Sequence, residues 1–118
     1  MSANITSEGF KQIREFIQNK WKYIQVLGEN NEVLFTVEPN DTRIGTQFDA
    51  YLNNPLIMEL YLQGTDPEIS IGTAIGGANL VAEIDGEAMV SVVYTNKFVF
   101  QNPEDQLAIR IQLQIPTI

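Results

Sequence analysis

The chain contains neither cysteine nor histidine. Without cysteine it can form no disulfide bond and offers no thiolate to a metal ion. Without histidine it lacks the side chain that most often serves as a general base near neutral pH or as a metal ligand. Ser-His-Asp and Cys-His catalytic sites are therefore excluded. We expect no catalytic residue, no cofactor and no metal site, and we interpret the protein as a non-enzyme.

Basic residues are scarce. Seven lysines and arginines stand against fifteen acidic residues, which gives a formal net charge of −8. Such a surface repels phosphate backbones, so no nucleic-acid partner is expected. Four of the bases lie in the first 22 residues, and none lies between Arg43 and Lys97. This asymmetry is typical of a solvated surface, or of a basic end that docks on an acidic face of a neighbouring copy.

Long apolar runs are also missing. The start, Met1 to Ile5, has neither a basic lead nor an apolar stretch, so it does not resemble a signal peptide. The longest apolar stretch, residues 88–94, is far shorter than the roughly 20 residues that cross a bilayer. We therefore expect a protein that is made in a cytoplasm and has no membrane partner.

The length of 118 residues predicts one domain, residues 1–118, with one core. A helix is predicted over residues 6–20, with Thr6 as its N-cap and Ile5 packing on its first turn. Large apolar residues recur there at spacings of three and four, which indicates one apolar stripe along the helix. The members of that stripe are Phe10, Ile13, Phe16, Ile17 and Trp21.

After the helix the apolar period changes to two, which is typical of strands. Turn residues separate the segments, and Asp85-Gly86 predicts a tight hairpin in which both residues have positive φ. The segment 38–54 predicts a turn and then a short helical turn at Phe48, Tyr51 and Leu52. Strands are predicted over residues 23–27, 32–37, 56–63, 80–84, 88–94, 97–100 and 106–115.

This order of elements predicts a mainly β (α+β) fold. Six or seven antiparallel strands form a β-sandwich or open barrel, with the N-terminal amphipathic helix packed on it. Aromatic residues fit either core packing or a stacking platform for a ligand or partner. Because Phe98 and Phe100 share a strand face and Trp21 extends the helix stripe, core packing is the favoured interpretation.

Two segments resemble chemical sites superficially. Glu83, Asp85 and Glu87 are neighbouring carboxylates, and both glycoside hydrolysis and calcium binding require such groups. At a hairpin tip, however, these side chains are solvated. Residues 72–77 are rich in glycine like a phosphate loop, yet no Lys-Ser or Lys-Thr follows them. We interpret the first segment as an exposed turn. The second is interpreted as a flexible connection whose glycines permit close approach by a neighbouring chain.

The two ends of the chain resemble a known family. The segment Ile5-Thr6-Ser7-Glu8-Gly9-Phe10 with Ile13 is similar to the start of bacteriophage tail-fibre N-terminal (collar-type) domains. Phe98-Val99-Phe100, a polar turn and an alternating strand from Leu107 to Ile115 are similar to their end. Together these segments cover about a third of the chain. The sequence departs from the family where Trp21 leads into Tyr23 and at Gly76-Gly77-Ala78.

The resemblance implies a virion structural protein that is made in the host cytoplasm and docks on a baseplate, collar or capsid. Its expected partners are other virion proteins or copies of itself as a homo-oligomer, in a tail adaptor, fibre-docking or capsid cement role. The alternative is a small-ligand or carbohydrate-binding β-sandwich module. The residues that we expect at interfaces are Lys20, Trp21, Lys22, Gly76, Gly77, Glu83, Asp85 and Glu87.

Overall fold

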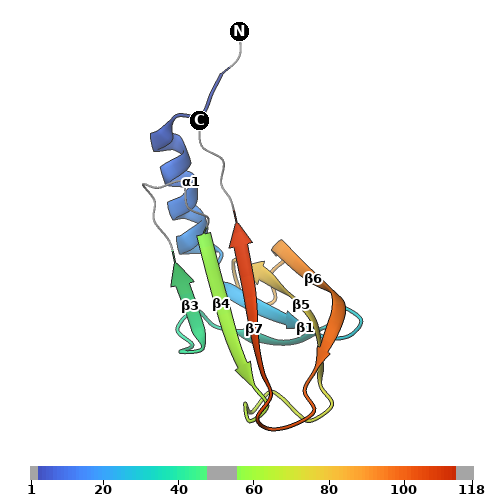
Figure 1. Ribbon diagram of the computed structural model, residues 1–118. Coiled ribbons are helices and arrows are strands. Elements are labelled where there is room, and N and C mark those ends of the chain that lie inside the picture. The colour runs from blue at the N-terminus through green and yellow to red at the C-terminus, as the bar shows by residue number, and fades with distance from the viewer. Residues whose placement is uncertain (1–2, 48–55, 114–118) are drawn as a thin grey trace.

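The computed structural model describes residues 3–47 and 56–113, which form one helix and two antiparallel sheets (Figure 1). Sheet A has the strand order β2-β1-β5-β6, and sheet B has the order β3-β4-β7. The predicted mainly β fold with one N-terminal helix is confirmed. The elements are α1 (Ser7–Lys20), β1 (Tyr23–Leu27), β2 (Val33–Val37), β3 (Ile44–Gln47), β4 (Leu56–Gln63), β5 (Ala74–Val81), β6 (Ala88–Val99) and β7 (Gln106–Leu113).

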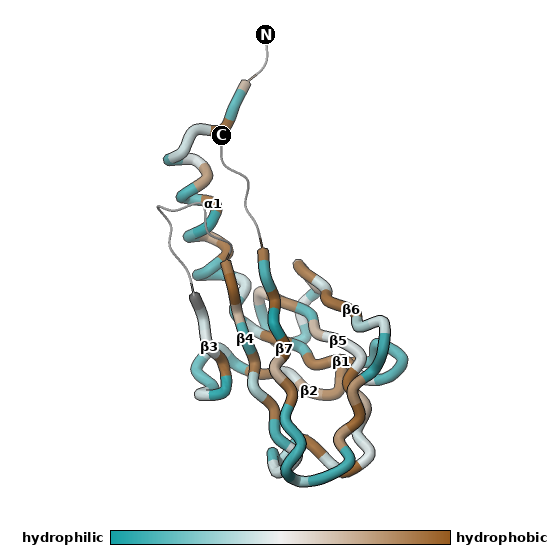
Figure 2. Tube along the Cα trace, viewed as in Figure 1, coloured by the Kyte–Doolittle hydropathy of each residue, from teal (hydrophilic) through white to brown (hydrophobic). Residues whose placement is uncertain are grey.

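The two sheets share one apolar core. Alternation along β4 and β7 turns every second residue inward, so that Leu60 and Ile109 pair across the strands and both are buried. In the central strands of sheet A, β1 and β5, consecutive residues are buried, so both faces of these strands are covered. Figure 2 shows the resulting brown stretches within the strands and teal loops beyond them. The buried core comprises Ile24, Val26, Val37, Met58, Leu60, Leu62, Ile69, Ile75, Ala78, Leu80, Phe100, Ile109 and Ile111.

The helix forms where it was predicted, because its N-cap and its apolar spacing agree. The Thr6 hydroxyl accepts a hydrogen bond from the Gly9 N–H at 3.1 Å. The helix projects from one end of the sandwich (Figure 1), and its buried residues are Arg14 and Ile17. Trp21, just after the helix, packs against the core. At 14 residues, α1 is neither long nor apolar enough to cross a membrane.

Three predicted strands are wrong in their bounds. β5 begins at Ala74 and ends at Val81, so the glycine-rich segment is largely strand, and residues 82–84 belong to the next connection. The segments 88–94 and 97–100 form one strand, β6. Ile75 pairs with Phe98 whereas Gly77 pairs with Val93, so a bulge in β6 absorbs the extra residues that resembled a turn.

The connection between β5 and β6 is longer than the predicted two-residue turn. Asp85 has a positive φ of 61°, but Gly86 does not share it, and the Gly86 N–H donates to the Glu83 carbonyl at 3.0 Å. The strand β3 was not predicted. The helical turn expected at Phe48, Tyr51 and Leu52 and the last two residues of the strand predicted over 106–115 lie outside the described residues.

Two glycines allow the strands of sheet A to approach closely. Gly77 has a φ of +155°, and a side chain there would overlap the carbonyl oxygen of Val92 on β6. A side chain at Gly76 would overlap the carbonyl oxygen of Gly28 at the end of β1. The close approach predicted for these glycines is therefore to the chain's own backbone.

Replacing Gly77 by alanine should destabilise the fold by about 2 kcal/mol, because the strand pair must shift to admit the methyl group. Gly45→Ala is the matched control, since a Cβ there would lie 3.9 Å from Tyr61 Cε2, an ordinary contact. The control should change the free energy of unfolding by no more than about 0.5 kcal/mol. Urea unfolding followed by Trp21 fluorescence measures both, and equal losses would contradict the account.

Candidate functional site

The predicted basic end and acidic hairpin lie at the same end of sheet A. Tyr23 pairs with Val81, so the chain before β1 and the chain after β5 leave the sheet together. Lys20 and Lys22 are exposed on the first side, whereas Trp21 is half-buried against the core. Opposite charges from two copies would meet here only if these ends faced each other. The acidic residues on the other side, Glu83, Asp85 and Glu87, are all exposed.

The remaining predicted interface residues offer no surface. Gly76 and Gly77 are buried within β5, between β1 and β6, so they are not part of a candidate surface. Trp21, Phe98 and Phe100 pack on or in the core, as the favoured interpretation requires. Phe100 is fully buried and meets Phe98 edge to face, with ring centroids 5.0 Å apart.

The apolar stripe of the helix is divided between the core and solvent. Ile17 is buried, but Ile13 is 38% exposed and Phe16 is 55% exposed, and Ile5 just before the helix is exposed as well. Ile13 and Phe16 lie about 60° apart around the helix axis. Ile5 precedes the N-cap Thr6, and its Cγ2 atom lies beside Gly9 in the first turn. We call Ile5, Ile13 and Phe16 the helix stripe. Its exposure follows from the projection of α1 beyond the sheets.

A polar row crosses the outer face of sheet A. The Asn79 amide nitrogen donates to Gln25 Oε1 at 3.1 Å, and the Ser91 hydroxyl donates to Asn79 Oδ1. The Gln25 amide also donates to the Gly86 carbonyl at 3.4 Å, so the connection after β5 contacts β1. These residues occupy matched positions on β1, β5 and β6. The row therefore ties the edge strand β6 to the centre of the sheet.

Arg43 forms ion pairs with three carboxylates from the two loops that run between the sheets, the β2–β3 loop and the β4–β5 loop. The Arg43 guanidinium donates to Asp41 and Glu68 through paired nitrogen–oxygen contacts of 2.8–3.0 Å, and to Asp66 Oδ2 at 3.1 Å. Asp66 Oδ2 also accepts from the Gln63 N–H at 3.0 Å. Arg43 holds the pKa values of Asp41 and Glu68 below their ordinary range, mainly through these hydrogen bonds.

This cluster fastens the loop after β2 to the loop after β4, and its oxygens are directed at the guanidinium. Within residues 3–47 and 56–113, no group of carboxylates is arranged to hold a metal ion. We interpret the Arg43 cluster as a structural clamp. Sequence reasoning missed it because more than twenty residues separate Arg43 from Asp66 and Glu68, and no periodicity links them.

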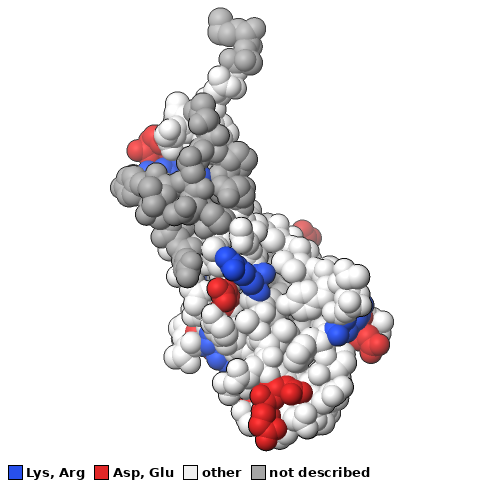
Figure 3. Space-filling model, in the orientation of Figure 1, with Lys and Arg blue, Asp and Glu red and all other residues white. Residues whose placement is uncertain are grey.

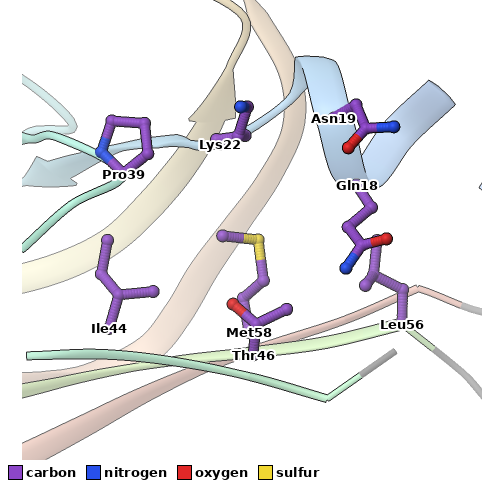
Figure 4. Close-up of a pocket in the computed structure, with 8 residues that line it drawn as sticks. All are labelled: Gln18, Asn19, Lys22, Pro39, Ile44, Thr46, Leu56 and Met58. Atoms are coloured by element: carbon purple, nitrogen blue, oxygen red, sulfur yellow. The ribbon is translucent and has the colours of Figure 1, made fainter. Parts of the chain in front are cut away.

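A small cleft lies between the end of α1 and sheet B (Figure 4). Its volume is about 260 Å³, slightly below the size that drug-like ligands usually occupy. Polar side chains from the helix end face an apolar floor, and Lys22 supplies the only charge among the lining residues. The lining residues are Gln18, Asn19, Lys22, Pro39, Ile44, Thr46, Leu56 and Met58.

The outer face of sheet B carries one exposed aromatic side chain. Tyr61 is 51% exposed, and its hydroxyl donates to Glu59 Oε2 at 2.8 Å, which raises the pKa of the phenol. A hollow of about 480 Å³ borders the ring where the small Ala108 lies opposite it on β7, with Gln63 and Gln106 at its rim. Figure 3 shows a basic and an acidic side chain side by side near the middle of this face and a group of acidic side chains at its lower end.

Comparisons of the chain with protein-family models, with curated proteins and with solved structures each found no match. Its function is therefore inferred from its own residues and their arrangement.

Replacing Arg43 by glutamine should lower the free energy of unfolding near neutral pH by about 2 kcal/mol, because charged hydrogen bonds are lost and three carboxylates repel one another. Arg43 lowers the pKa values of Asp41 and Glu68 in the folded state. Their contribution to the free energy of unfolding is therefore present above about pH 4 to 5, and it is lost as the pH falls through these lowered pKa values. Urea unfolding at a series of pH values should show this acid loss in the natural chain.

The acid loss should be much smaller in Arg43→Gln. Arg110→Gln, which removes an equal charge from an exposed position on β7, is the control and should keep the acid profile of the natural chain. Identical profiles for the natural chain and Arg43→Gln would refute the structural role of the clamp.

Proposed function

We propose that this protein is a non-enzymatic assembly protein that acts through protein–protein contacts. The observation that carries the proposal is the helix stripe, a row of exposed large apolar side chains on a helix that stands clear of the sandwich. Exposed apolar side chains are common singly, but a row on one side of a projecting helix is typical of an element that inserts into a partner.

The stripe is suited to helix-in-groove binding. Ile13 and Phe16 are one helical turn apart, and Gly9 beside them adds no side chain that would keep a partner away. Complete burial of such a side chain stabilises a complex by about 1.5–3 kcal/mol. The adjacent side of the helix carries an ion-paired group, in which Lys11 lies 4.0 Å from Glu8 and 3.9 Å from Glu15 between nitrogen and oxygen atoms. They would form a polar rim around the apolar contact.

The particle to which the protein would belong is inferred from the resemblance at its two ends. The quoted segment Ile5 to Phe10, with Ile13, overlaps the helix stripe. We therefore extend the proposal to a virion structural protein in a tail or baseplate adaptor, fibre-docking or capsid cement role. Its partners would be other virion proteins or copies of itself.

Substituting Phe16 by serine should abolish association while leaving the fold intact, because this ring is mainly exposed. Co-sedimentation with the virions produced by the encoding genome measures association, and urea unfolding measures the fold. We expect loss of co-sedimentation with a stability change within about 1 kcal/mol. Ile17→Ser, on the buried side of the same helix, should instead cost about 3 kcal/mol of stability. A natural chain that never co-sediments, or a Phe16→Ser chain that still does, would overturn the proposal.

Tyr61 favours carbohydrate binding as a second candidate function. An exposed aromatic ring offers a face with a negative quadrupole to the C–H groups of a sugar ring. The neighbouring hollow is large enough for one sugar residue, and the amides of Gln63 and Gln106 can both donate to and accept from hydroxyl groups.

This candidate predicts that Tyr61→Ala weakens glycan binding by about tenfold or more, the equivalent of one lost stacking contact. Tyr61→Phe keeps the ring and loses only the hydroxyl, so it should retain binding within about threefold. A glycan array identifies the ligand, and calorimetric titration of that ligand compares the three chains. An array without any bound glycan would eliminate this candidate.

A further inference from the structure

β6 is the least protected sheet edge in the described part of the chain. It lies at the outside of sheet A and has 12 residues, whereas the other edge strands β2, β3 and β7 have 5, 4 and 8. Edge strands in stable monomers usually carry charges, prolines or bulges that block a further strand. Residues 88–96 contain no charged residue and no proline, whereas β7 carries Arg110. Bulges interrupt both the pairing of β2 with β1 and the pairing of β6 with β5.

Residues 90–93 of β6 pair regularly with β5. Val90 and Val92 pair with Leu80 and Ala78 of β5 and pack on the core, which fixes the strand in place. Met89 and Val93 point outward and are 48% and 57% exposed. Bulges interrupt the pairing with β5 beyond Val93 and at Met89, which lies between the pairs Leu80–Val90 and Val81–Ala88. Residues 90–93 therefore form a regular, uncharged edge with main-chain donors and acceptors on its outer side.

We infer that this edge pairs antiparallel with the same edge of a second copy of the chain, around a two-fold axis at Ser91. The four-stranded sheet A of each copy would then continue into that of the other. The inference deepens the proposed function and rests on it, because it names a second copy as the partner of one assembly surface.

The sequence of the edge is complementary to itself in this register. An axis at Ser91 places Met89 of one copy opposite Val93 of the other on the outer face, and Val90 opposite Val92 on the inner face. The two Ser91 side chains meet at the axis, where the polar row through Asn79 and Gln25 would run on into the second copy. Each apolar residue thus faces an apolar residue, which is the arrangement that stabilises neighbouring strands.

The absence of charge at this edge permits a second copy to approach. With a net charge of −8, two copies repel each other over most of their surfaces, but residues 88–96 contribute no charge to that repulsion. Past the paired segment, the antiparallel direction carries Lys97 of each copy toward the other copy's connection 82–87. The acids exposed on that connection would be balanced there by the single base of β6.

Because the chain has no cysteine, a single introduced thiol reports the register directly. In an antiparallel pair, directly opposed residues have Cα atoms about 4.5–5.5 Å apart, within disulfide range. Ser91→Cys should form a covalent dimer in high yield under mild oxidation, whereas Ser70→Cys, an exposed position in the loop after β4, should not. Equal yields from the two chains would refute the register.

Val93→Lys tests the same contact without cross-linking. It should convert the dimer into a folded monomer in sedimentation velocity, because two lysines would be forced into an apolar seam. The Val93→Lys chain should dimerise again when mixed with a Met89→Glu chain, since lysine then faces glutamate across the axis. A natural chain that sediments as a monomer at all concentrations, or that uses this edge only in a complex with a different protein, would overturn the inference.

Phe16→Ser separates this inference from the proposed function. That chain should keep the β6 dimer and the Ser91→Cys cross-link, because the helix stripe lies on a different element. Dimerisation through β6 together with absent virion association would overturn the proposed function alone. Virion association that depends on Phe16 while the natural chain stays monomeric would overturn the β6 inference alone.

Discussion

The structure depends on burying one apolar face of each sheet against the other without closing the sheets into a barrel. Leu60 and Leu62 of β4 meet a layer formed by Ile24 and Val26 of β1, and none of these side chains retains solvent exposure. Two packed sheets bury their inner faces completely but leave four edge strands and two outer faces. The surfaces proposed for binding are the parts of the fold that this solution leaves without a neighbour: the helix beyond the sheets, the edge β6 and the outer face around Tyr61.

Local patterns predicted the elements whose side chains alternate strongly. α1, β1, β4 and most of β7 follow from apolar spacing and caps alone, because each signal lies within a few residues. β5 was predicted too short because glycine has a low strand propensity. Gly76 and Gly77 are required there because backbone atoms of Gly28 and Val92 leave no room for a side chain, and those residues are distant in sequence. β6 was divided for a related reason, because Thr95 and Asn96 resemble a turn and form a bulge.

The candidate surfaces were predicted less well than the fold. The sequence identified the apolar stripe of the helix, but which half remains exposed depends on how far α1 extends past the sheets. Charge counting predicted a basic end that docks on an acidic face of a neighbouring copy, but it could not show that strand pairing brings Lys20 and Glu83 to the same end of sheet A. Tyr61 gave no signal of its own because an alternating strand does not reveal which face is covered. The non-local pairings that decide these points are not encoded in any short window.

Strand pairing also constrains how the chain acquires its structure during synthesis. The hairpin β1–β2 joins neighbouring segments, but β4 pairs along its whole length with β7, some fifty residues further on. Contacts of such long range slow folding, since a large loop must close before they form. Sheet B therefore stays incomplete on the ribosome until residue 113 has left the exit tunnel. Until then, the inner face of sheet A is a hydrophobic surface that a chaperone can hold.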